Sequence, residues 1–157
     1  MKTPNANHSG FSLVEVTLAL GLAGFCLTAI YGLLPVALNS NRTSIEQTGA
    51  TGILSAVVTD LRATPSGSPG TPAVSGQFAI PIPANPAAGS APTTLYFSGD
   101  GQFSAEPTPA SRYRITVTFQ ESGGGNAPTY ASVKASWPAQ AAKASGSVEV
   151  FVAMDRN

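Results

Sequence analysis

Charged side chains are scarce in this sequence. Only 16 of its 157 residues are Lys, Arg, Asp or Glu, which is 10%, whereas an ordinary soluble domain carries about 25%. The 8 basic and 8 acidic residues give a formal net charge of zero. A nucleic-acid-binding domain needs a basic excess to displace phosphate counterions, and a charged disordered tail needs a high charge density. Nucleic acid is therefore not expected as a partner, and the length suits one domain with an anchor or tail.

Cysteine and histidine are even rarer. Cys26 is the only cysteine, so no disulfide forms within the chain, and His8 is the only histidine, so a histidine-based metal site cannot be built. A lipoprotein signal needs a small residue before its cysteine, and Phe25 stands there instead. Nucleophile-elbow, phosphate-loop and dinucleotide-binding motifs are missing too. We therefore expect no catalytic residue, no cofactor and no metal, and a protein that is not an enzyme.

Two glycine-rich turns are the remaining candidates for ligand binding. Asp100, in the turn Ser98–Gly101, is the nearest to a calcium ligand. Calcium takes about six to eight oxygen ligands, and Glu106 is the only other acid nearby, which favours a turn aspartate. The run Gly123–Gly125 has no neighbouring lysine and no strand-to-helix frame, which argues against a phosphate site.

The uncharged residues gather in two long runs, of which the first is apolar. It has 26 residues, from Val16 to Asn41. Within it, Val16–Leu38 has 23 residues, about 34 Å as a helix, which is enough to cross the roughly 30 Å apolar core of a bilayer. A secretory signal has a shorter core of about 7–15 apolar residues and a small-residue cleavage site, so it is the weaker interpretation. Pro35 removes a helical hydrogen bond, and we expect a kink there.

Glu15 is an unusual residue at the start of such a run, because a carboxylate at mid-depth in a bilayer costs roughly 2.5–3.5 kcal/mol. Its position alone leaves two interpretations open: the side chain reaches water at the interface, or it has a partner within the membrane. The order of features around it is more informative. A short polar leader carrying Lys2 ends in Gly10, Phe11 follows, and Glu15 stands fifth after that glycine.

The residues Gly10-Phe11-Ser12-Leu13-Val14-Glu15, followed by an apolar helix, resemble the class III signal of type IV pilins and type II secretion pseudopilins. The resemblance covers residues 10 to about 40. It implies cleavage between Gly10 and Phe11 by a prepilin peptidase on the cytoplasmic side, and N-methylation of the new Phe11 amine. It also implies that Glu15 pairs with the Phe11 amine of a neighbouring subunit during assembly.

The rest of the chain predicts a small head. Residues 39–62 carry an apolar stripe at helical spacing, which predicts that the helix continues out of the bilayer and packs on a sheet. The second uncharged run, residues 63–99, holds seven prolines up to Pro92 and predicts an irregular connector over 63–93, with few regular elements and an apolar patch at Phe78-Ala79-Ile80.

Strand patterns fill residues 94–157. A short hairpin is predicted around the turn Ser98–Gly101, then three alternating segments at 112–120, 131–137 and 146–154. We expect three or four antiparallel strands with one face on the helix, Trp137 in the core, and half-buried tyrosines, namely Tyr96, Tyr113 and Tyr130. The residues around Trp137 and the last strand resemble the C-terminal part of minor pilins and pseudopilins.

The sequence thus predicts an α+β fold of the pilin type, in five parts: a cleaved leader (1–10), a transmembrane helix (11–38), its continuation (39–62), a connector (63–93) and a sheet (94–157). The resemblance implies a structural, minor subunit of a type IV pilus or type II secretion pseudopilus. Its N-terminus would be cytoplasmic and its head periplasmic, or extracellular in a filament. Its partners would be other pilin subunits, prepilin peptidase, the inner-membrane assembly platform and the lipid bilayer. The alternative is a membrane-anchored binding module that presents its head to a substrate or surface.

Overall fold

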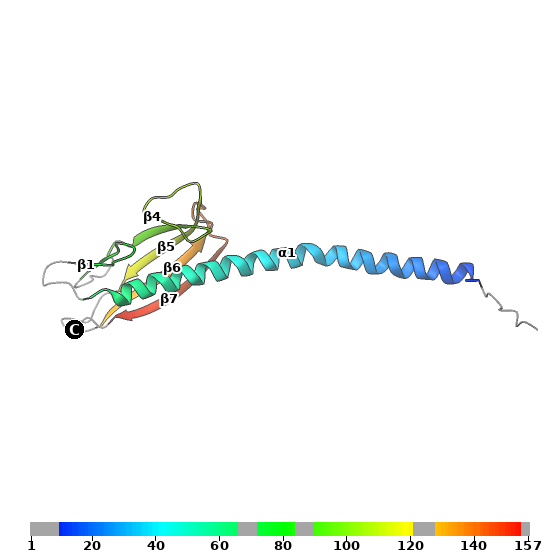
Figure 1. Ribbon diagram of the computed structural model, residues 1–157, viewed down its shortest axis with the longest axis horizontal. Helices are drawn as coiled ribbons and strands as arrows, with labels where there is room; N and C mark the ends of the chain where they lie inside the picture. Colours follow the sequence, from blue (N-terminus) through cyan, green and yellow to red (C-terminus); the bar gives the residue numbers. More distant parts are fainter. Residues whose placement is uncertain (1–9, 66–71, 84–89, 121–127, 155–157) are drawn as a thin grey trace, which may run out of the picture. The chain divides into compact units, whose positions relative to one another are not determined.

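The computed structural model describes residues 10–65, 72–83, 90–120 and 128–154. The chain divides into two units, residues 1–42 and 43–157. One long helix, α1 (Leu13–Ala63), begins in the first unit and ends in the second, and Figure 1 shows it as one continuous ribbon. Residues 1–9 of the leader, including Lys2, lie outside the described part.

The first part of α1 is apolar and fully exposed. Every residue from Leu13 to Asn41 is exposed, including long side chains such as Leu18 and Phe25. Among the described residues, α1 is the one helix long and apolar enough to cross a membrane. Side chains of this kind need an apolar environment, and a bilayer supplies one. The segment is therefore a candidate membrane span near the N-terminus.

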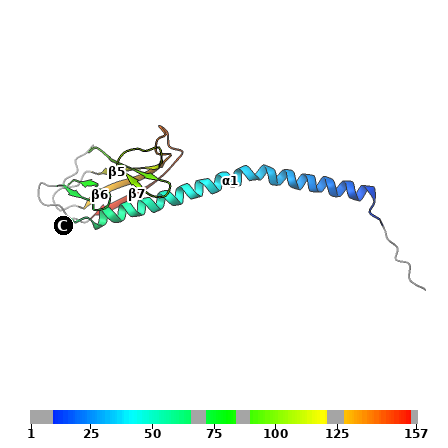
Figure 2. The same ribbon diagram turned by 45° about the horizontal axis from the view of Figure 1, so that its top comes forward.

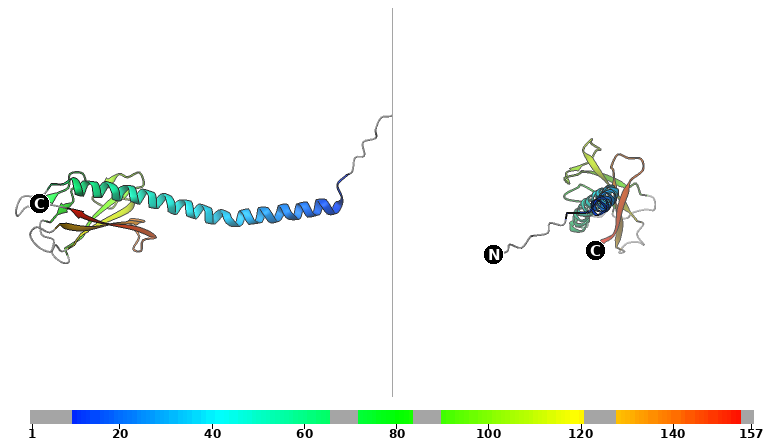
Figure 3. Two further views of the ribbon diagram at one scale, coloured as in Figure 1. Left: turned by 90° about the horizontal axis from the view of Figure 1, so that it is seen from below. Right: turned by 90° about the vertical axis from the view of Figure 1, so that its right-hand side faces the viewer.

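The second part of α1 buries one face. Ala50, Ile53, Leu54, Val57 and Leu61 recur every three or four residues and are buried. They join the apolar core of the second unit together with residues of the sheet. The prediction that residues 39–62 continue the helix and pack it on a sheet is confirmed. The fold is α+β, and Figure 3 shows α1 over one face of the sheet.

The sheet is antiparallel and has five strands, with the order β4-β3-β5-β6-β7. Their bounds are β3 Thr93–Ser98, β4 Phe103–Ser104, β5 Ser111–Phe119, β6 Thr129–Trp137 and β7 Gly146–Met154. The prediction of three or four strands was therefore one or two too low. The sheet includes β4, which has only two residues and is the return arm of the predicted hairpin. Figure 2 shows β5, β6 and β7 side by side.

Alternation along the strands places one set of side chains on the helix and the other on the opposite face, as period-two patterns require. Ile115, Val117, Val133 and Val152 are fully buried on the helix side. The other face carries polar residues, with Thr116, Lys134 and Glu149 aligned across β5, β6 and β7.

Two aromatic residues, Trp137 and Tyr113, pack against each other in the core. The burial of Trp137 was predicted, whereas the full burial of Tyr113 was not. Trp137 is 6% exposed, as predicted, and its ring lies 6.2 Å from that of Tyr113 in an edge-to-face arrangement. Tyr113 itself is 2% exposed, so its prediction as half-buried was wrong. The reason is Gly49 on α1: a Cβ there would lie 2.5 Å from Tyr113 Oη, so the glycine lets the ring end reach the helix.

The connector contributes to the core more than its composition suggested. Its described part, residues 72–83, has few regular elements, as predicted: β1 (Ala73–Val74) pairs with β2 (Pro81–Ile82). Yet Phe78, Ile80 and Ile82 are buried in the core, so this stretch packs as part of the head and does more than connect two elements. Residues 66–71 and 84–89 lie outside the described part.

Candidate functional site at the start of the helix

Gly10 and Phe11 lie just outside the first turn of α1. The helix begins at Leu13, and Ser12 is its N-cap: the Glu15 amide donates to Ser12 Oγ at 3.2 Å, and the Val16 amide donates to the Ser12 carbonyl at 3.2 Å. A side-chain oxygen at this position satisfies one of the free amides of a first helical turn. The Gly10–Phe11 peptide bond is therefore exposed and non-helical.

Glu15 occupies the third position of the helix. Negative charge near a helix N-terminus is stabilising by about 0.3–1 kcal/mol, because the free amides give that end a partial positive charge. Ser12 and Glu15 also have the Ser-x-x-Glu spacing of a capping box. The sequence interpretation missed this role of Ser12, although the spacing was visible.

The candidate site continues along one face of α1. Phe11, Glu15, Ala19 and Ala23 follow at intervals of four residues, and with Val16 and Leu20 they line a shallow, mostly apolar groove. Residues four apart lie on the same helix face. Glu15 is thus the one acid on a face otherwise made of apolar and small side chains, and the small residues would let another helix approach closely.

Pro35 lies inside α1, twenty residues beyond Glu15. It has no amide hydrogen to donate to the carbonyl of Tyr31, four residues earlier. The helical assignment continues through this position to Ala63. A kink at Pro35 stays a prediction.

Asp100 has the geometry of a turn aspartate. The Ser98 hydroxyl donates to its carboxylate, and the Gln102 amide donates to Ser98 Oγ at 3.0 Å. The Ser98 hydrogen bond lowers the pKa of Asp100 below its ordinary value, with a smaller contribution from its own backbone amide. In the described part of the chain no three acidic, histidine or cysteine side chains gather as metal ligands. His8 and the Gly123–Gly125 run lie outside the described residues.

The helix start therefore combines an accessible Gly10–Phe11 bond, a capped first turn and a single carboxylate on an exposed apolar face. These features suit cleavage before the helix and helix-to-helix contact in an apolar medium. Comparisons with protein-family models, with curated proteins and with solved structures found no match to this chain.

Proposed function

We propose that the chain is a structural subunit, of the minor type, of a type IV pilus or type II secretion pseudopilus. It is made as a precursor, cut between Gly10 and Phe11 by prepilin peptidase, and N-methylated at Phe11. The apolar part of α1 holds it in the inner membrane with its head in the periplasm until it enters a filament. The observation that carries the proposal is the order Gly10, Phe11, Glu15 immediately before a long, exposed, apolar helix.

The local geometry supports processing at this bond. A peptidase needs a backbone that it can reach in a non-helical conformation, and the Ser12 cap starts α1 after the bond rather than across it. Gly10 is exposed, and a Cβ built on it would meet no atom within 4 Å. Packing among the described residues therefore gives no reason for a glycine at this position, which suits a glycine that is recognised by an enzyme.

The position of Glu15 supports assembly through the helix. Cleavage would create an ammonium group on Phe11, which precedes the helix by two residues and lines the same groove as Glu15. A carboxylate and an ammonium attract strongly in a low dielectric, and leaving either group unpaired there is costly. Pairing between neighbouring subunits would thus favour one axial register of one helix against the next.

Cleavage is tested by coexpressing the full chain with and without a prepilin peptidase. The wild-type chain should lose residues 1–10, run faster on a gel, and begin at a methylated Phe11 by mass spectrometry. Gly10→Asp should stay uncut, whereas Ser12→Ala, which alters only the helix cap, should still be cut. Equal mobility of the wild-type chain with and without the peptidase would refute the processing step.

A further inference from the structure

The loop of the β3–β4 hairpin holds a pair of residues that can react with each other. Asp100–Gly101 is the only Asp-Gly or Asn-Gly pair in the sequence. Glycine after aspartate favours isomerisation, because glycine has no side chain to hinder attack by its own amide nitrogen. In that reaction the Gly101 nitrogen bonds to Cγ of the protonated Asp100 carboxyl group, and the amide proton leaves with the carboxyl hydroxyl as water. Hydrolysis of the resulting succinimide ring restores aspartate or gives isoaspartate, in which the main chain runs through Cβ and Cγ.

The backbone of the loop requires this glycine. Gly101 has a φ of +82°, in the left-handed region that favours glycine. Its amide donates to the Ser98 carbonyl at 3.1 Å, and the Ser98 amide donates to the Gln102 carbonyl at 3.0 Å. This is the pattern of a three-residue hairpin loop whose last residue is left-handed. A side chain at position 101 would strain the loop, so the hairpin keeps a residue that makes its neighbour Asp100 reactive.

Ser98 engages both groups that would react. Its hydroxyl donates to the Asp100 carboxylate, and its carbonyl accepts the Gly101 amide hydrogen. The same hydroxyl accepts the Gln102 amide at 3.0 Å, which fixes its position in the loop. The carboxylate is therefore held by Ser98, and the attacking amide keeps its proton. The Ser98 hydrogen bond also lowers the pKa of Asp100, which reduces the fraction of the protonated form that reacts.

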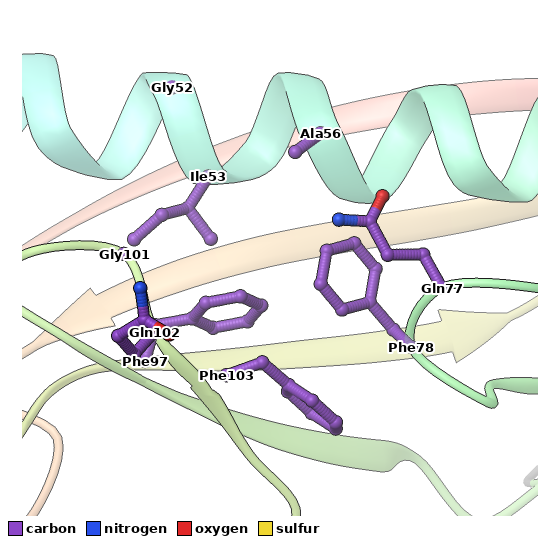
Figure 4. A pocket seen from close by; sticks show the side chains of 9 residues that line it. All are labelled: Gly52, Ile53, Ala56, Gln77, Phe78, Phe97, Gly101, Gln102 and Phe103. Atoms are coloured by element: carbon purple, nitrogen blue, oxygen red, sulfur yellow. The ribbon is translucent and has the colours of Figure 1, made fainter.

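The residues that follow the loop pack against the core of the head. Gly101 and Phe103 line a pocket of about 470 Å³ together with Ile53 of α1, as Figure 4 shows. Phe103 belongs to an aromatic cluster, in which its ring lies 5.5 Å from that of Phe78 and 5.7 Å from that of Phe97. Isoaspartate in the loop would lengthen the main chain by one carbon just before β4. The Phe103 ring would then be displaced, which close packing tolerates poorly.

We infer that Asp100–Gly101 is a site of spontaneous isomerisation and that Ser98 protects it in the folded head. The reaction needs no enzyme and no co-reactant other than water. While the hairpin is closed, Ser98 engages the carboxylate and the amide, so the reaction is slow. Once the hairpin opens, both groups are free and react as they do in a short peptide. The inference concerns the head alone and is independent of the proposed function, because no residue of the helix start takes part.

The test is the rate at which isoaspartate accumulates at position 100. The full-length chain is kept in detergent micelles at mildly acidic pH, and isoaspartate is measured by peptide mapping after labelling with a protein isoaspartate methyltransferase. Ser98→Ala should isomerise about tenfold faster than the wild-type chain, since a hydrogen bond to a charged group shifts an equilibrium by about that factor. Ser98→Thr keeps the hydroxyl and should stay near the wild-type rate. Ser104→Ala removes another hydroxyl of the same hairpin and should also leave the rate unchanged.

Two results would overturn the inference: a folded Ser98→Ala chain that isomerises at the wild-type rate, or a folded wild-type chain that isomerises as fast as the same chain in denaturant. Thermal melts followed by Trp137 fluorescence check that each variant folds, since Trp137 is the only tryptophan and is buried in the head. If Ser98→Ala does not fold, Ser98→Cys takes its place, because a thiol has a similar shape but is a weak donor. The same two outcomes then decide.

Discussion

At the scale of single residues, Asp60 shows how one side chain ties the connector to the helix. It is buried near the end of α1, and its carboxylate accepts the Gln77 amide at 2.9 Å and the Phe78 amide at 3.0 Å. These two bonds hold the turn that places Phe78 in the core. No local pattern indicates a contact between residues 17 and 18 positions apart, so the sequence interpretation missed Asp60 and treated the turn as linker.

Replacing Asp60 tests this role. Asp60→Ala leaves the buried Phe78 amide without its acceptor, and an unsatisfied buried donor costs about 1–3 kcal/mol. Asp60→Asn keeps one oxygen and should lose less. Unfolding of the head, followed by Trp137 fluorescence in denaturant, measures both changes. Equal stability of Asp60→Ala and the wild-type chain would show that the turn is held by other contacts.

Gly49 and Gly52 form a matched pair on one helix, three residues apart. Gly52→Ala should stabilise the head by about 1 kcal/mol through helix propensity, because its Cβ meets open space. Gly49→Ala should gain the same propensity but lose about 1–3 kcal/mol by overpacking against buried Tyr113. The same denaturation experiment compares them. Adding Tyr113→Phe should recover part of the Gly49→Ala loss, and no recovery would mean that the hydroxyl is not the obstacle.

At the scale of elements, the long periodic segments were predictable and the short ones were not. The apolar stripe of α1 repeats over several turns, and the alternation of β5, β6 and β7 repeats over several residue pairs. Such a pattern identifies both the type of element and the face that it buries. The strands β1, β2 and β4 have two residues each, too few for any period. Their positions depend on contacts with distant elements, such as the aromatic cluster around Phe78.

The close approach of Gly146 to Trp137, where β6 pairs with β7, predicts the effect of a substitution on the stability of the head. Gly146 stands opposite Trp137, and a Cβ there would lie 2.5 Å from Cζ2 of the indole ring. Gly146→Ala must therefore displace a rigid ring and should destabilise the head by about 1–3 kcal/mol. Ser147→Ala, at the exposed neighbouring position, is the control and should change little. A shift in the Trp137 emission maximum for Gly146→Ala alone would report the displaced ring.

At the scale of the whole molecule, the few charged side chains are divided between the start of the helix and the head. The candidate membrane span carries Glu15 at its start, whereas all other charged residues in the described part of the chain lie within residues 42–149. In the second unit Arg112 on β5 pairs with Glu46 on α1 at 2.7 Å, and both are partly exposed, so the pair contributes at most about 1 kcal/mol.

The candidate site was largely readable from the sequence, because Gly10, Phe11 and Glu15 lie within six consecutive residues. The role of Ser12 as the N-cap was not predicted, because it depends on the exact residue at which the helix begins. The pocket in the head could not be predicted, since Ile53, Phe78 and Phe103 come from three separate segments and only the fold brings them together.

The most direct measurement of the central claim is the amount of this chain in sheared filaments from cells that express the whole assembly machinery. Glu15→Val should be cleaved and inserted in the membrane like the wild-type chain, yet be absent from the filaments, because it has no carboxylate to pair with a neighbouring Phe11 amine. Glu15→Gln should behave in the same way, and Thr17→Val, an exposed position two residues further along α1, should enter filaments normally. Normal incorporation of Glu15→Val would contradict assembly through the helix start.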